Sequence, residues 1–232
     1  MSSRAVAGRS VRSPLAQLLH ALNQPLTGLQ CSMEVALAGP RTPEQYVQGL
    51  HEGLELSGRM RLLVEAIREV VDIGEASEND LTKNDELQPA ELRAVLQEVA
   101  DDLEPVAEVK GVRIRIALDR TAGSLPPQTG SPQTTSSETI SSQTRRRQRI
   151  NSTMFRLLDS ALSLAARGTE LQIGAGEQWF RVRWRGGKGA STVSPPELGL
   201  LVAQAGLERA GALWERERTE ESETVTVRLP NA

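Results

Sequence analysis

Residues 18–27 read LLHALNQPLT, an apolar periodic segment that holds one histidine, His20, and one proline, Pro25. Apolar residues recur here at intervals of three and four, which predicts one amphipathic helix over about residues 13–38. At about 100° per residue, His20 lies roughly 140° from the centre of the apolar stripe. The imidazole is therefore expected to face water. The stripe consists of Leu15, Leu18, Leu19, Leu22, Leu26, Leu29 and Met33, and the neighbours of His20 are Gln17, Gln24, Thr27 and Cys31.

The position of His20 admits two interpretations. A lone histidine on a polar helix face is usually a solvated side chain with no chemical role. An imidazole held on a rigid helix and open to water is also suited to accept a phosphoryl group and pass it on. The other histidine, His51, is expected to be exposed or structural.

A second helix is expected to follow almost at once. Ser13 followed by Pro14 is typical of the start of a helix, and Gly39-Pro40 is typical of its end, so these residues bound the first helix. Residues 42–45, TPEQ, then form a capping-box sequence that opens a helix to about residue 71. Two helices joined by a short turn form a hairpin, which cannot cover both of its own apolar stripes.

We therefore predict that residues 13–73 pair with a second copy through a two-fold axis, giving a dimeric four-helix bundle. The alternative is an intramolecular bundle with helices from the second half. The second half has its own mixed pattern, which favours the homodimer.

Composition limits the classes of function. The chain has 232 residues and a net charge of −3, so neither nucleic acid nor a membrane is an expected partner. Residues 1–12 are expected to be a flexible N-terminus and lack the apolar core of a secretory signal. The single cysteine forms no internal disulfide, and no metal-ligand spacing is present. We expect a cytoplasmic protein.

The second half has a different pattern. Residues 74–86 are polar and acidic and are expected to be a linker to a domain over residues 87–232. In that domain, residues 121–144 are rich in Ser, Thr, Pro, Gln and Gly, so we expect a disordered insertion or long loop. The remaining pattern predicts an α/β sandwich, a mixed sheet with helices on one face. Helices are expected near 89–110, 146–166 and 196–209, and strands near 112–118, 170–175, 179–185, 212–218 and 224–229.

The string HALNQPLTGLQ, residues 20–30, resembles the phospho-acceptor box of bacterial sensor histidine kinases. In that family a helical histidine is followed by an acidic residue, three variable positions and a proline, and His20 and Pro25 match this spacing. Ala21 stands where the family has the carboxylate that assists proton removal from the imidazole. The resemblance implies that Gln17, Asn23, Gln24 and Thr27 dock a receiver domain and orient the phosphoryl group.

The second half resembles the ATP-binding domain of the same family. EVKGVRIRI (108–116) is similar to the approach to its first long strand, FRLLDSALSLA (155–165) to its asparagine-bearing helix, and TVTVRLP (224–230) to its last strand. The resemblance covers about residues 15–230. It implies an α+β fold, with a helical-hairpin dimer followed by a histidine-kinase-type α/β sandwich.

The positions that would bind nucleotide are altered. The asparagine that helps to hold magnesium falls on Ser160, and the aspartate that reads adenine falls on Arg185, whose guanidinium has only donors. Gly187 and Gly189 are retained, but the phosphate-binding glycine run is reduced to Gly199, preceded by Glu197. A glutamate beside phosphates would repel them. We therefore expect no cofactor of the chain's own and no ATP binding.

The leading hypothesis is a histidine phosphotransferase, or degenerate histidine kinase, of a two-component phosphorelay. His20 would exchange a phosphoryl group with the aspartates of receiver domains, and the receiver would supply the magnesium. Two alternatives remain open: an active ATP-dependent sensor histidine kinase with unusual nucleotide contacts, and a non-enzymatic dimeric scaffold that binds response regulators.

Overall fold

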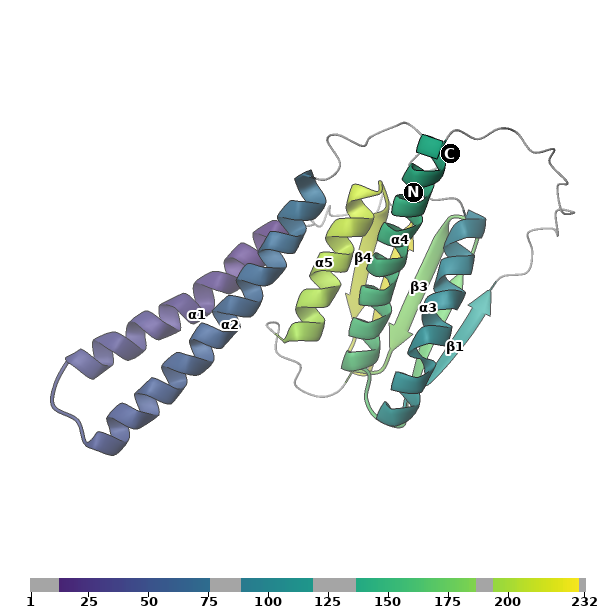
Figure 1. Ribbon diagram of the computed structural model, residues 1–232. Coiled ribbons are helices and arrows are strands. Elements are labelled where there is room, and N and C mark those ends of the chain that lie inside the picture. Colours follow the sequence, from purple (N-terminus) through teal and green to yellow (C-terminus); the bar gives the residue numbers. More distant parts are fainter. Residues whose placement is uncertain (1–12, 76–88, 119–136, 187–193, 230–232) are drawn as a thin grey trace, which may run out of the picture. The chain divides into compact units, whose positions relative to one another are not determined.

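The computed structural model describes residues 13–75, 89–118, 137–186 and 194–229 (Figure 1). The chain divides into two compact units, Met1–Ile67 and Arg68–Ala232. The predicted flexible N-terminus, most of the predicted linker and residues 121–136 of the predicted insertion lie outside the described residues. None of the described helices is long and apolar enough to cross a membrane.

The first unit is a helical hairpin of α1 (Pro14–Leu37) and α2 (Pro43–Glu75), which continues into the second unit. Local capping explains both starts: Ser13 Oγ accepts a hydrogen bond from the Ala16 amide at 3.3 Å, and Thr42 and Gln45 exchange side-chain to backbone hydrogen bonds at 3.1 and 3.4 Å. The predicted hairpin is confirmed. Its second helix runs to Glu75, slightly past the predicted linker start.

The second unit is a five-stranded mixed sheet with three helices on one face, so the predicted fold class is confirmed (Figure 1). The strand order is β1-β2-β3-β5-β4, in which β1 and β2 are parallel and the other neighbours antiparallel. The elements are α3 (Pro89–Lys110), β1 (Arg113–Leu118), α4 (Ser137–Leu164), β2 (Glu170–Ala175), β3 (Trp179–Trp184), α5 (Pro195–Arg209), β4 (Leu213–Arg218) and β5 (Glu223–Arg228).

The core of the second unit lies between the sheet and its helices. Alternate residues of β3 and β5 are buried, because successive strand side chains point to opposite faces. Phe180 and Trp184 are among the largest fully buried side chains, and they belong to the same buried cluster as the apolar residues of α3 and α4. Gly111 and Gly211, with φ of 71° and 80°, end α3 and α5 in the left-handed conformation that glycine adopts without steric cost.

One prediction was wrong in this unit. α4 begins at Ser137, so residues 137–144 are helical and not part of a disordered insertion. The composition of this segment suggested disorder, because Ser, Thr and Gln side chains can bury little apolar surface. Each of these residues costs only a few tenths of a kcal/mol in a helix, so an amphipathic helix that is anchored further along can extend through them.

Candidate functional site

His20 lies on the exposed side of α1, as the sequence pattern predicts. Leu18 and Pro25, on other faces of the same helix, are both buried. Among the residues that the structure describes, none forms a hydrogen bond or an ion pair with the His20 ring. The imidazole is therefore held by a backbone of regular helix, while its nitrogens are open to solvent.

Three polar side chains surround His20 at helical spacing. Asn23 and Gln24 lie one turn further along α1 and are exposed, and Gln17 lies one turn before His20 and is half-buried. Asn23 and Gln24 carry amide N–H groups, which are suitable donors for the oxygens of a phosphoryl group. The arrangement can thus support a group that is covalently bound to His20.

Thr27 is exposed but its hydroxyl is engaged. Its Oγ1 donates a hydrogen bond to the Asn23 carbonyl at 2.9 Å, one turn back in the helix. Pro25 has no amide hydrogen, so it leaves the Ala21 carbonyl without its usual helical donor. The regular hydrogen bonding of α1 is therefore interrupted within one turn of His20.

No acidic side chain occurs between Ser13 and Met33. Ala21, which follows His20, is half-buried and cannot accept a proton. A base for the imidazole must therefore come from solvent, from a partner or from another part of the chain.

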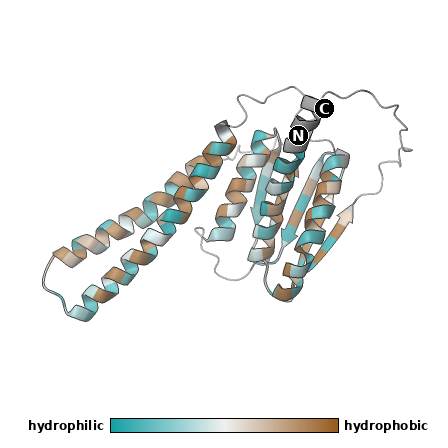
Figure 2. Ribbon diagram, in the orientation of Figure 1, coloured by the Kyte–Doolittle hydropathy of each residue, from teal (hydrophilic) through white to brown (hydrophobic). Residues whose placement is uncertain are grey.

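The hairpin leaves a large share of its apolar side chains open. α1 and α2 approach closely where small residues allow it: a methyl group at Gly28 would lie 3.5 Å from Leu56 Cδ1, and one at Gly53 3.5 Å from Leu29 Cδ1. Even so, Leu50 and Leu54 remain about 70% exposed. Hydrophobic residues recur along both helices (Figure 2). The exposed apolar residues of this unit are Leu19, Leu26, Met33, Val35, Leu37, Tyr46, Val47, Leu50, Leu54 and Val64.

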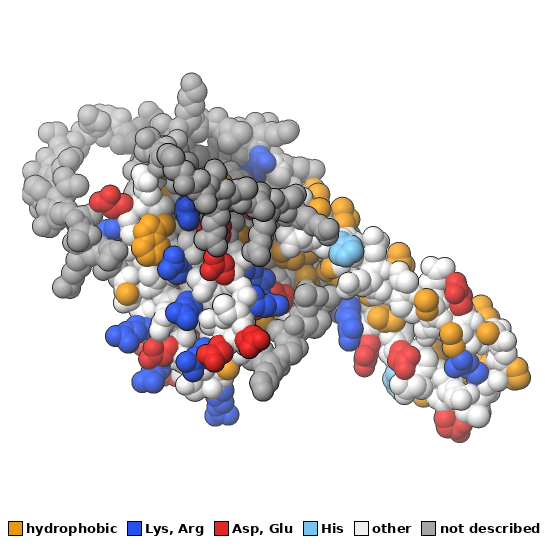
Figure 3. Space-filling model, turned by 180° about the vertical axis from the view of Figure 1, so that it is seen from behind, with side chains coloured by type: hydrophobic (Ala, Val, Ile, Leu, Met, Phe, Trp, Pro, Cys, Tyr) orange, Lys and Arg blue, Asp and Glu red, His pale blue; other side chains and the backbone are white. Residues whose placement is uncertain are grey.

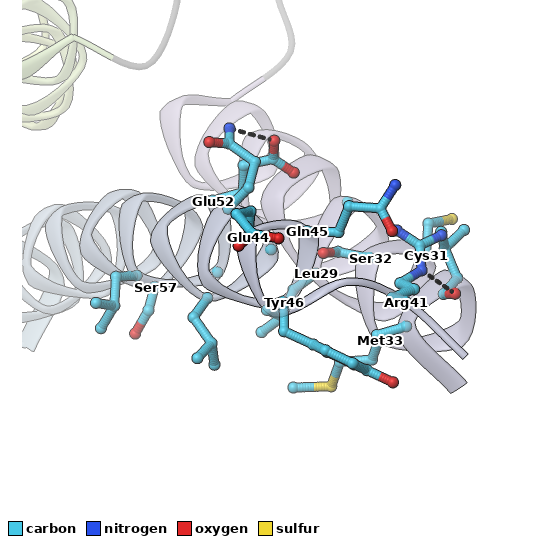
Figure 4. A pocket seen from close by; sticks show the side chains of 18 residues that line it. Leu29, Cys31, Ser32, Met33, Arg41, Glu44, Gln45, Tyr46, Glu52 and Ser57 are labelled. Carbon is cyan, nitrogen blue, oxygen red and sulfur yellow. Dashed lines mark hydrogen bonds between the residues drawn. The ribbon is translucent and has the colours of Figure 1, made fainter. Parts of the chain in front are cut away.

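These open side chains border a groove of about 920 Å³ between the two helices, toward the turn that joins them. Figure 4 shows Met33 of α1 and Tyr46 of α2 on the same side of the hairpin. A monomer would expose this surface to water at a cost that rises with its apolar area.

In the second unit, the structure brings two of the predicted nucleotide-site positions together. Ser160 of α4 is buried, and a methyl group at Gly199 of α5 would lie only 2.2 Å from Ser160 Oγ. A second contact forms where Gly206 lies against Thr153. Glycine thus allows α4 and α5 to pack directly against one another along their length.

The N-terminus of α5 differs from an anion-binding helix start. Such a start offers free backbone N–H groups, but Pro195 and Pro196 occupy the first two helical positions and have none. Ser194, the N-cap residue, makes no capping hydrogen bond. The carboxylate of Glu197 lies in the first turn, where it interacts favourably with the helix dipole.

Glu197 belongs to a buried ion-pair network that could not be predicted from the sequence. We expected this carboxylate beside a phosphate site. Instead it accepts hydrogen bonds from Arg216 at 2.8 and 3.1 Å and from Arg218 at 2.8 Å, both from β4. Glu223 of β5 accepts from the same two arginines, at 2.7 Å from Arg216. Both carboxylates are at least 90% buried.

The network is electrically balanced, with two carboxylates and two guanidinium groups. Burial by itself would lower the pKa of Arg216, but the hydrogen bonds to Glu197 and Glu223 outweigh it and raise that pKa. The hydrogen bond to Glu223 raises the pKa of Arg218. Both guanidinium groups are therefore charged at neutral pH, and their hydrogen bonds to Glu197 and Glu223 lock the start of α5 to the β4–β5 hairpin.

Arg185 lies directly after β3 and is exposed, and its backbone carbonyl accepts a hydrogen bond from the Ala166 amide at 2.8 Å. Gly187 and Gly189 lie outside the described residues. Across the described ranges, no group of three or more His, Cys, Asp or Glu side chains is arranged to hold a metal ion.

Comparison with known proteins finds structures that are similar to this chain in fold. No family model and no curated protein matches the chain. Among solved structures, the cytoplasmic segment of histidine kinase QseC is 20% identical, with a TM-score of 0.44 over 63% of this chain and 78% of that one.

Two further structures match over more of the chain. The Acinetobacter baumannii histidine kinase AdeS is 19% identical, with a TM-score of 0.45 over 90% of this chain and 96% of that one. A histidine kinase from Burkholderia phymatum STM815 is 13% identical, with a TM-score of 0.44 over 94% and 99%. At these identities the likeness concerns the fold, and no activity follows from it.

Proposed function

We propose that this protein is a histidine phosphotransferase of a two-component phosphorelay, related to histidine kinases, in which His20 exchanges a phosphoryl group with receiver-domain aspartates. The observation that carries the proposal is the exposure of His20 on α1, one turn from the exposed amides of Asn23 and Gln24. The match of residues 20–30 to a phospho-acceptor box supports the same role.

The transfer step needs little covalent machinery. A neutral nitrogen of His20 attacks the phosphorus of an aspartyl phosphate, an N–P bond forms, and the P–O bond to the aspartate breaks. The aspartate leaves as a carboxylate, and the phosphoimidazolium releases its other N–H proton to solvent. The acyl phosphate is already activated, so positioning by α1 and magnesium from the receiver supply most of the catalysis.

The lack of an acidic residue in α1 between Ser13 and Met33 favours transfer from an acyl phosphate over autophosphorylation. A kinase that attacks ATP with histidine gains from a base beside the ring, and Ala21 provides none. Transfer from an acyl phosphate has a better leaving group and depends less on that base.

We expect that the second unit does not bind ATP. The direct packing of Ser160 against Gly199, the prolines at the start of α5 and the inward-facing Glu197 all support this view. Isothermal titration of the full chain with Mg-ATP at millimolar concentration should give no binding heat. A saturable heat, or label from γ-labelled ATP on the protein, would favour the active kinase instead.

We further propose that the hairpin forms a homodimer, because its exposed leucines need a partner surface. Replacing Leu50 and Leu54 by lysine should convert the dimer to a monomer in analytical ultracentrifugation, since each charge would be buried without a partner. Glu55→Lys, on an exposed position of the same helix that does not line the groove, serves as the control and should leave the dimer intact. A monomeric wild-type chain, or equal behaviour of the Leu50/Leu54 variant and the control, contradicts the dimer.

The function itself is tested by incubating the chain with a panel of receiver domains that carry labelled aspartyl phosphate. We expect the label to move to this chain from at least one receiver. Binding of a receiver without any transfer would favour the scaffold.

A further inference from the structure

The face of the sheet opposite the helices presents several arginines. Within the second unit the three described helices all lie on the other face, so alternate strand residues point outward here. Figure 3, seen from behind Figure 1, shows Arg and Lys side chains on this side with acidic side chains among them. The outward residues with positive charge are Arg113, Arg115, Arg181, Arg183 and Arg228.

Two of these arginines are already paired. Arg113 lies 3.9 Å from Glu170 on the neighbouring strand, and Arg228 lies 3.4 Å from Glu215. Both pairs are at the border of the face, on the β1 and β4 sides. Their charge is neutralised locally.

The other three arginines lack a described acidic partner. Arg115 and Arg183 form no ion pair with the described carboxylates, and Arg181 donates only to the hydroxyl of Thr226, at 3.2 Å. The strand register places Arg115 and Arg183 on either side of Gln172, about 10 Å apart by the spacing of strands. Arg181 and Arg183 are two residues apart on β3. Three like charges therefore lie close together, on a chain whose net charge is −3.

We infer that Arg115, Arg181 and Arg183 form a docking surface for an extended acidic polypeptide segment of a partner protein. Same-face side chains of an extended chain repeat every two residues, about 6.5 to 7 Å, which is also the spacing of Arg181 and Arg183 along β3. Guanidinium groups bind carboxylates through paired hydrogen bonds. The surface thus matches alternate carboxylates in spacing, charge and hydrogen bonding.

Single-stranded nucleic acid fits the same surface less well. Its bases need an open aromatic ring for stacking, and Trp179 is the aromatic residue beside these arginines. One side of its ring covers Gly174 and Gly176, and the Arg181 guanidinium lies 5.5 Å from the ring centroid.

The inference is tested by fluorescence anisotropy of a labelled oligoglutamate peptide titrated with the full chain at low salt. We expect saturable binding that weakens as salt is added. The variant R115Q/R181Q/R183Q should bind about tenfold more weakly, because three exposed charge pairs are lost. The control R113Q/R228Q removes two paired arginines of the same face and should bind almost as the wild type does.

Thermal unfolding of both variants shows whether the fold is kept. Three results would overturn the inference: no saturable binding of oligoglutamate, equal loss in the two variants, or tighter binding of labelled oligothymidylate than of oligoglutamate. The experiment does not involve His20, so its outcome is independent of the proposed phosphotransfer.

Discussion

Replacement of His20 by alanine should abolish the transfer of phosphate from a phosphorylated receiver domain to this chain. The imidazole nitrogen is the nucleophile, and alanine leaves no group that could form the N–P bond. Loss of a nucleophile lowers a rate by at least about a thousandfold, so transfer should fall to background. The measurement is the appearance of label on the chain, followed over time with a receiver that carries labelled phosphate.

The chain contains its own matched control. His51 is its other histidine, lies on α2 and is exposed, as His20 is. His51→Ala should transfer at the rate of the wild type. If His20→Ala retains transfer, or if the two variants lose it equally, His20 is not the acceptor. We also expect His20→Ala to bind the receiver domain still, because alanine removes only one of the α1 side chains that would contact it.

Replacement of Glu197 by alanine should lower the free energy of unfolding by about 2 to 3 kcal/mol. Removing one partner of a buried ion pair leaves the other charge uncompensated, which costs roughly 3 to 5 kcal/mol when both groups are fully buried. Arg216 and Arg218 are partly exposed and keep Glu223 as a partner. The expected loss is therefore about 2 to 3 kcal/mol, smaller than for a fully buried pair. Chemical denaturation of the wild type and the variant measures the difference.

Glu215→Ala is the control for this substitution. Glu215 lies on β4 like the two arginines, but its pair with Arg228 is exposed on the other face of the sheet. An exposed pair contributes at most about 1 kcal/mol, so the control should be close to the wild type. Equal losses for Glu197→Ala and Glu215→Ala would contradict the structural role of the network.

Most helices and strands could be predicted because their signals are local. The capping residues Ser13 and Thr42 begin both hairpin helices at the predicted positions, and alternation in Trp179–Trp184 marks a strand with one buried face. The start of α4 could not be predicted, since the helix continues into residues of weak intrinsic preference.

The site was predictable to different degrees in the two units. The exposure of His20 follows from helical periodicity alone, since an angle of roughly 140° from the apolar stripe leaves no other direction. The partners of Glu197 did not follow from the sequence, because they depend on the register of β4 and β5. The alternation of charge in Glu215–Arg218 is consistent with either face of a strand, and only the sheet shows which charges are buried.

The role of His20 is tested most directly by locating the transferred phosphate. After incubation with a phosphorylated receiver, the chain is digested at alkaline pH, where phosphohistidine is stable, and the phosphopeptide is mapped by mass spectrometry. We expect a phosphoryl group on His20 that is lost on brief acid treatment. Phosphate on His51 or on a carboxylate, or a chain that remains unmodified with every receiver tested, would contradict it.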